Sequence, residues 1–165
     1  MKLRLPMLVL LTILLVSFTD TPLPLQNTDF TISIDENERR WVDSVFNAMT
    51  PTERLGQLFF IRAHSDKGPE HVADVKRQIL EHKVGGLCFF QGTPEEQVRL
   101  TNQYQSLANI PLLISIDGEW GLGMRMKAST ISFPHQLTLG AIQDNRLIYE
   151  MGAEIARQMK RIGIH

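Results

Sequence analysis

The 165-residue sequence predicts an α/β fold built around a parallel sheet. Three short apolar runs, at residues 58–61, 87–90 and 112–117, have the length of β-strands. Amphipathic helical patterns lie between them, and apolar runs that do not alternate with polar residues are typical of strands covered on both faces. Strands and helices in this alternation build either a doubly wound sheet or a (β/α)8 barrel.

Capping signals predict where the helices begin. Residues 41–49 carry apolar side chains at helical spacing, and Thr50-Pro51-Thr52-Glu53 then indicates a capping box with Thr50 as the N-cap residue. Thr93-Pro94-Glu95-Glu96 repeats this signal and predicts a helix to about residue 107. Further helices are predicted at residues 69–82 and 147–162. Gly163 should end the last helix, and residues 164–165 are expected to begin a fourth strand.

The N-terminus predicts an exported protein. Residues 1–19 contain Lys2 and Arg4 followed by an apolar run that is short for a bilayer span, so we expect a signal peptide or a membrane anchor. No clean cleavage site follows, and both alternatives stay open. Residues 20–40 are polar and contain proline, which indicates a linker. The expected location is periplasmic or extracellular, and the membrane is a partner only if the leader remains uncleaved.

Charge and cysteine content exclude several classes of function. The net charge of −1 gives no electrostatic support for binding nucleic acid, whereas a neutral ligand such as a sugar fits it. The single cysteine, Cys88, excludes an internal disulfide and is expected to be a buried, inert thiol. The sequence contains no phosphate-binding loop, dinucleotide-binding glycine pattern or nucleophile elbow. No protein partner is evident.

A carboxylate ends the third predicted strand and is the clearest candidate site residue. Asp117 is followed by a glycine-rich loop, and in parallel α/β folds ligands bind beyond the carboxyl ends of the strands. A carboxylate accepts several hydrogen bonds, which suits sugar hydroxyls. Asp117 either contacts substrate or serves as a turn residue. Arg125 either donates hydrogen bonds in the same cleft or holds Asp117 in place.

Other polar and aromatic residues near this loop allow more than one interpretation. Glu119 either contacts the ligand or pairs with a loop donor, and Trp120 either stacks on a sugar ring or packs within the loop. No histidine is spaced to join Asp117 and Glu119 at a metal, so neither a metal nor a cofactor is expected. His64 and His135 lie near predicted strand ends or loops, where they either line a cleft or are surface or turn residues, and the second is expected. The sequence predicts no role for the remaining histidines, His71, His82 and His165.

Several motifs in order along the chain resemble a known family. They are Met49-Thr50-Pro51, Glu53-Arg54-Leu55-Gly56-Gln57-Leu58, Val84-Gly85-Gly86, Phe89-Phe90, Pro111 to Asp117, Glu119, Gly121, Arg125, Phe133-Pro134 and Gly140-Ala141. Over residues 41–165, this series resembles the opening of the catalytic domain of glycoside hydrolase family 3. The sequence from Glu119 to Arg125 resembles that of exported bacterial members of the family's β-N-acetylglucosaminidase branch.

The resemblance implies a specific fold and chemistry. Residues 41–165 would form about the first three βα units of an incomplete (β/α)8 TIM barrel. The family hydrolyses β-linked glucosides, xylosides or N-acetylglucosaminides, usually with retention and without a metal. By resemblance, Asp117 and Arg125 are expected to bind the sugar. The family's nucleophile, its Lys-His pair and its acid/base lie downstream of the matched region.

No catalytic residue is therefore expected in these 165 residues, and the fragment alone is expected to be inactive. The expected function of the complete protein is hydrolysis of O-glycosidic bonds by a retaining β-N-acetylglucosaminidase-like enzyme, acting on a β-linked glycoside or N-acetylglucosaminide. Two alternatives remain: a β-glucosidase or xylosidase of the same family, and a catalytically dead sugar-binding fragment.

Overall fold

The computed structural model describes residues 35–127 and 130–165. The predicted signal peptide or anchor at residues 1–19, and the predicted linker up to residue 34, lie outside the described residues. The chain divides into two units, residues 1–39 and 40–165, and the sheet with the helices that connect its strands belongs to the second. None of the helices within the described ranges is long and apolar enough to cross a bilayer.

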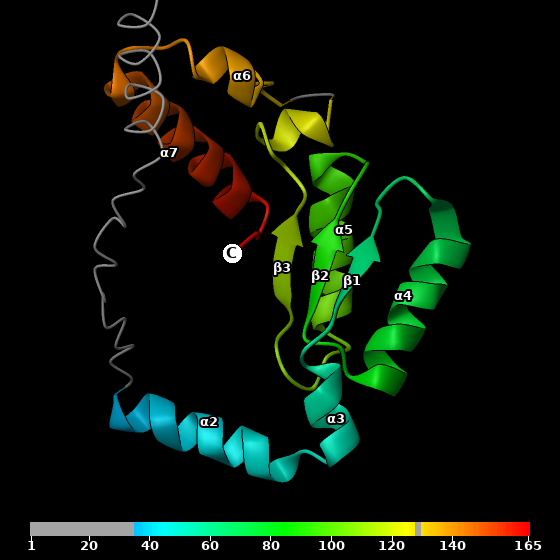
Figure 1. Cartoon of the computed structure of the whole chain (residues 1–165). Helices are drawn as coiled ribbons and strands as arrows, with labels where there is room; N and C mark the ends of the chain where they lie inside the picture. Colours follow the sequence, from blue (N-terminus) through cyan, green and yellow to red (C-terminus); the bar gives the residue numbers. More distant parts are fainter. Residues whose placement is uncertain (1–34, 128–129) are drawn as a thin grey trace, which may run out of the picture. The chain divides into compact units, whose positions relative to one another are not determined.

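Three parallel strands alternate with helices, as the sequence predicts (Figure 1). The strands β1 (Phe60–Ala63), β2 (Gly86–Phe89) and β3 (Leu113–Ile116) form one sheet in the order β1-β2-β3. Helix α4 (Gly68–His82) connects β1 to β2, and α5 (Pro94–Gln105) connects β2 to β3. The sheet therefore consists of consecutive βαβ units, which places the carboxyl ends of all three strands at the same edge.

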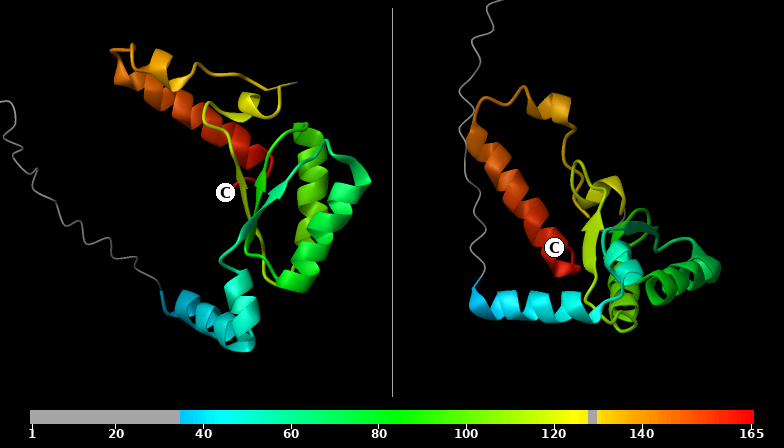
Figure 2. Two further views of the ribbon diagram at one scale, coloured as in Figure 1. Left: turned by 45° about the vertical axis from the view of Figure 1, so that its right-hand side comes forward. Right: turned by 60° about the horizontal axis from the view of Figure 1, so that its bottom comes forward.

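Helices α4 and α5 cover the same face of the sheet (Figure 2). Their apolar side chains meet those of the strands in one buried core, and burial of this apolar surface is the main force that holds the layers together. The core includes Val75 and Ile79 from α4, Leu100 and Tyr104 from α5, and Ala63, Leu87, Phe89 and Ile114 from the strands.

The opposite face of the sheet is partly exposed. Parallel pairing aligns Phe60 with Gly86 and Leu113, and successive residues of a strand point to opposite faces. Phe60 is 47% exposed and Leu113 is 53% exposed. The prediction that the strands are buried on both faces is therefore wrong for the described part of the chain, where helices cover only one face. Cys88, which was expected to be buried, is partly exposed for the same reason.

The first strand begins two residues later than the sequence indicates. The predicted strand at residues 58–61 is wrong at its start because the turn after α3 (Pro51–Gly56) continues through Leu58 and Phe59. The amide of Leu58 donates to Leu55 O at 3.1 Å, and that of Phe59 donates to Gly56 O at 3.0 Å. Pairing with β2 starts at Phe60, and Leu58 is 78% exposed.

The two predicted capping boxes have different outcomes. At α3 the box is complete, because Glu53 N donates to Thr50 Oγ1 at 3.3 Å and Thr50 N donates to Glu53 Oε2 at 2.9 Å. At α5, Glu96 N donates to Thr93 Oγ1 at 3.3 Å. The Glu96 carboxylate, however, accepts from Arg99 Nε at 2.8 Å, so the predicted second box lacks its reciprocal half.

A further cap lies in the predicted linker. Asp35 Oδ1 accepts from Asn37 N at 2.7 Å and from Glu38 N at 2.9 Å, and Glu38 Oε2 accepts from Asp35 N at 3.0 Å. Helix α2 (Glu36–Ala48) accordingly begins within the residues predicted to form a linker. The Asp-x-x-Glu spacing is the same capping signal that predicts α3.

The last helix forms as predicted, as α7 (Asn145–Arg161), after α6 (Gln136–Leu139). Asp144 caps it by accepting from Arg146 N at 3.0 Å. Residues 164–165 are not a strand, but His165 N donates to Ile114 O at 3.0 Å and Ile114 N donates to His165 Nδ1 at 2.9 Å. The chain therefore reaches the free edge of β3, where the sequence predicted a fourth strand.

Candidate functional site

One residue follows each strand at the carboxyl edge of the sheet, and these three residues form the centre of the candidate site. They are His64 after β1, Phe90 after β2 and Asp117 after β3. The hydrogen bonds of the sheet continue to them, since Phe90 N donates to Ala63 O at 2.9 Å and Asp117 N donates to Phe89 O at 3.2 Å. The sheet thus fixes their backbones at the edge where parallel α/β proteins bind ligands.

Asp117 is held by Arg125, which is the second of the two roles considered for this arginine. Arg125 Nε donates to Asp117 O at 2.8 Å, and its Nη2 forms an ion pair with Asp117 Oδ2. The side chain of Arg125 is 15% exposed, whereas that of Asp117 is 35% exposed. Among the described residues, no hydrogen bond to Asp117 Oδ1 is found. This oxygen can therefore accept a hydrogen bond from a ligand while Arg125 fixes the other.

Phe90 links the three strand ends. The guanidinium carbon of Arg125 lies 4.6 Å from the centre of its ring, and that of Arg62 lies 4.9 Å from it. The imidazole of His64 stacks on the same ring, with the centroids 5.5 Å apart and the planes at 23°. Cation–π attraction and stacking thus join residues from β1, β2 and the loop after β3.

His64 is buried and lines a cavity, so the cleft alternative holds for it and the expected surface or turn position is wrong. It is 6% exposed because its ring packs between Phe90 and His71, whose ring lies edge-on at 5.4 Å. His64 N donates to His71 Nε2 at 3.0 Å, and His64 Nδ1 lies 3.6 Å from Asp66 Oδ1. Burial and then the nearby positive charge of Lys67 lower the pKa of both imidazoles.

The glycines after β3 allow a close-packed turn. Gly121 has a φ of 87°, which is a left-handed conformation that favours glycine. A Cβ at Gly123 would lie 2.7 Å from Ser132 Cα, so only glycine fits there. The turn η1 (Leu122–Met124) follows, and Arg125 N donates to Leu122 O at 3.0 Å. This turn brings the chain back to the end of β3, so that Arg125 contacts Asp117, which lies eight residues earlier in the sequence.

Trp120 packs within the loop, which supports the packing alternative over the stacking platform for this residue. Its ring stacks on His135 with the centroids 4.1 Å apart and the planes at 18°. Gln136 Nε2 donates to Glu119 O at 2.5 Å and ties the loop to the start of α6. His135 is exposed, as predicted. Glu119 is also exposed, and within the described part of the chain its hydrogen bonds involve its backbone.

The arrangement suits binding of a neutral polar ligand. It offers a carboxylate of fixed orientation, a planar cation and an aromatic ring at the carboxyl edge of the sheet. Within residues 35–127 and 130–165, no group of three His, Cys, Asp or Glu side chains is close enough to hold a metal ion. The ion pair with Arg125 fixes the orientation of the Asp117 carboxylate. Among the described residues, no second carboxylate is hydrogen-bonded to Asp117.

Comparison with known proteins gives a consistent result. Residues 50–165 match the glycosyl hydrolase family 3 N-terminal domain. A beta-N-acetylglucosaminidase/beta-glucosidase of Cellulomonas fimi is 26% identical over 133 residues, which are 81% of this chain and 23% of that protein. The structure of the beta-glucoside phosphorylase BglX bound to 2FGlc shares the fold, with a TM-score of 0.64 and 19% identity over 79% of this chain and 23% of that one.

The chain thus spans 23% of the length of both of these relatives. The family match covers every strand of the sheet and the Asp117–Arg125 loop. The resemblance seen in the sequence is confirmed, and the chain belongs to glycosyl hydrolase family 3, with residues 50–165 in its N-terminal domain.

Proposed function

We propose that the protein is a retaining β-glycosidase and that this chain supplies the sugar-binding part of its active site. The observation that carries the proposal is the fixed carboxylate of Asp117 at the end of β3, with one oxygen paired to Arg125 and the other open to a ligand. Membership of glycosyl hydrolase family 3 supports the reaction class.

Asp117 binds the sugar in this proposal and does not attack it. A carboxylate that is already oriented loses little freedom when it accepts a hydrogen bond from a sugar hydroxyl. Its negative charge also stabilises the oxocarbenium-like transition state of glycoside hydrolysis. The nucleophile and the acid/base are proposed to lie in later parts of the protein, since this chain spans 23% of the matched relatives.

The proposed substrate is a β-N-acetylglucosaminide. The name of the Cellulomonas fimi relative, beta-N-acetylglucosaminidase/beta-glucosidase, supports this sugar and equally supports a β-glucoside as the second candidate. The sequence from Glu119 to Arg125, which resembles the N-acetylglucosaminidase branch, favours the first. The incomplete (β/α)8 barrel belongs to the same proposal, in which further strands cover the exposed face of the sheet.

The test is a panel of aryl β-glycosides carrying N-acetylglucosamine, glucose or xylose, incubated with the complete protein. We expect the highest kcat/KM with the N-acetylglucosaminide, and a first product of β configuration when the reaction is followed by NMR. A highest kcat/KM with the glucoside would favour the second candidate. Absence of cleavage of every member of the panel would refute the proposed function.

Export to the periplasm or the medium is also proposed, on the basic and apolar start of the sequence. Cell fractionation tests it, and N-terminal sequencing of the mature protein distinguishes a cleaved signal peptide from an anchor. Recovery of the whole protein in the soluble cytoplasmic fraction, with Met1 retained, would refute export.

A further inference from the structure

A chain of contacts connects His71, in the first turn of α4, with Asp117. His71 Nε2 accepts the hydrogen bond from His64 N at 3.0 Å. The ring of His64 stacks on Phe90 with centroids 5.5 Å apart, and the guanidinium carbon of Arg125 lies 4.6 Å from the centre of the same ring. Arg125 in turn holds the carbonyl and the carboxylate of Asp117. A change at His71 can therefore reach the sugar-binding carboxylate through side chains in direct contact.

We propose that His71 is a positioning residue for the Asp117 site and that its protonation weakens sugar binding. This inference rests on the proposed function and adds a pH-dependent control to it. His71 does not itself contact the carboxylate. It acts by fixing the backbone of His64 through the hydrogen bond to its amide. The position of this backbone determines the position of the His64 ring, which stacks on Phe90.

The hydrogen bond between the two histidines exists in only one protonation state. An imidazole nitrogen that accepts a hydrogen bond carries no proton, so His71 is neutral here with its proton on Nδ1. Protonation would place a hydrogen on Nε2, directly opposite the N–H of His64. Since His64 is buried, its amide would lose its hydrogen-bond partner, and the strand end would have to shift to give it another.

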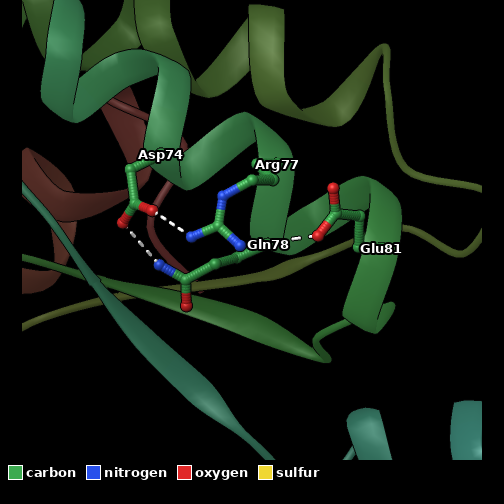
Figure 3. A network of polar contacts seen from close by, with 4 residues as sticks. All are labelled: Asp74, Arg77, Gln78 and Glu81. Atoms are coloured by element: carbon green, nitrogen blue, oxygen red, sulfur yellow. Dashed lines mark hydrogen bonds and ion pairs between the residues drawn. The ribbon is translucent and has the colours of Figure 1, made fainter.

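The groups around His71 determine the pH at which its imidazole is protonated. Burial of the ring, and then the charge of Lys67 in the preceding loop, lower the pKa of His71, whereas Asp74 on α4 and Asp66 in the loop raise it. The carboxylate of Asp74 is held by Arg77 at 2.5 Å and by Gln78 at 2.7 Å, so its charge is shared within α4 (Figure 3). The neutral form of His71 therefore persists at neutral pH and is lost in acid.

Other titratable groups at this end of the sheet must be distinguished from His71. His64 also has a lowered pKa, with burial as the main cause and with Arg62 among the charges that lower it. From α5, Glu96 and Arg99 line the same cavity as His64 but pair with each other at 2.8 Å. A substitution confined to His71 leaves all of these groups in place.

Two variants of the complete protein test the proposal. His71→Gln keeps a side-chain acceptor but does not titrate, and His71→Phe keeps a flat ring but removes the acceptor. Relative to H71Q, the wild-type KM for an aryl glycoside should rise about three- to tenfold between pH 8 and pH 5, as expected for loss of one hydrogen bond. H71F should have a raised KM at both pH values. A wild-type KM that follows the H71Q profile would overturn the inference.

A second readout does not depend on turnover. Hydrogen exchange of the His64 amide should be faster in the wild type than in H71Q at pH 5, and equal in the two proteins at pH 8. Equal exchange at both pH values would show that His71 does not control this strand end, and would overturn the inference. If the wild type cleaves no aryl glycoside, the proposed function fails, and the exchange comparison still decides the role of His71.

Discussion

Arg125 is joined to Asp117 twice, through Nε to the main-chain carbonyl at 2.8 Å and through Nη2 to the carboxylate. The two contacts fix the backbone at the end of β3 and the direction of the side chain together. Because the turn η1 brings Arg125 back to the strand, the fold of the loop and the orientation of the carboxylate depend on each other. The predictions on activity follow from this coupling.

Replacing Asp117 by Asn should lower kcat/KM for the preferred aryl glycoside by about ten- to a hundredfold, since hydrogen bonds to charged groups contribute about 1.5–3 kcal/mol. The matched control is Glu119→Gln, because Glu119 is exposed and, among residues 35–127 and 130–165, its hydrogen bonds involve its backbone. E119Q should change kcat/KM less than about threefold, as is usual for surface positions. Equal losses in the two variants would contradict the assignment of Asp117.

Arg125→Lys should lower kcat/KM about tenfold, although the positive charge remains. Lysine cannot bond the carbonyl and the carboxylate with a planar fork, and it loses the guanidinium contact with Phe90. The control is Arg146→Lys on α7, where the pairs with Asp144 at 3.4 Å and Glu150 at 3.3 Å lie at the surface. Steady-state kinetics on both variants checks this, and a fully active R125K would show that charge alone suffices.

Gly85→Ala should lower the free energy of unfolding by about 2–4 kcal/mol, as overpacking against a rigid backbone does. A Cβ at Gly85 would lie 2.0 Å from Gln57 O, in the turn that joins α3 to β1. Gly152→Ala is the control, because nothing lies within 4 Å of a Cβ there and alanine favours the helix by up to about 1 kcal/mol. Urea unfolding measures both, and a neutral G85A would contradict the packing.

Thr50→Ala should cost more stability than Thr93→Ala, about 1 kcal/mol for the first, because only the box at Thr50 is reciprocal. Hydrogen bonds from the backbone and side chain of Thr50 lower the pKa of Glu53 below its usual 4.5. This contribution is present above pH 4.5 and is lost as the pH falls through the lower folded-state pKa. Unfolding measured at several pH values should therefore show T50A converging on the wild type in acid.

Local patterns in the sequence predict the elements well because helices and caps depend on neighbouring residues. The box at Thr50, the helix of α4 and the strand that precedes Asp117 all follow from spacing alone. The Asp35–Glu38 cap carries the same signal, although it lies in residues whose polar composition predicts a linker. The late start of β1 has a different cause, since it depends on turn hydrogen bonds after α3 that compete with the apolar pattern.

Contacts between strand ends are harder to predict. Asp117 is found from its position, but the choice between the two roles of Arg125 depends on how the glycine turn folds. The hydrogen bond between His64 and His71 depends on the direction in which α4 leaves β1. The spacing of apolar residues along the sequence does not predict this direction. Exposure of one sheet face likewise depends on which elements cover it, and not on the apolar character of the strands.

A crystal structure of the complete protein with bound N-acetylglucosamine tests the central claim most directly. We expect a carboxylate oxygen of Asp117 within about 3.2 Å of a sugar hydroxyl oxygen, with Arg125 still paired to Asp117. A sugar bound in the active site without contact to Asp117 would contradict it.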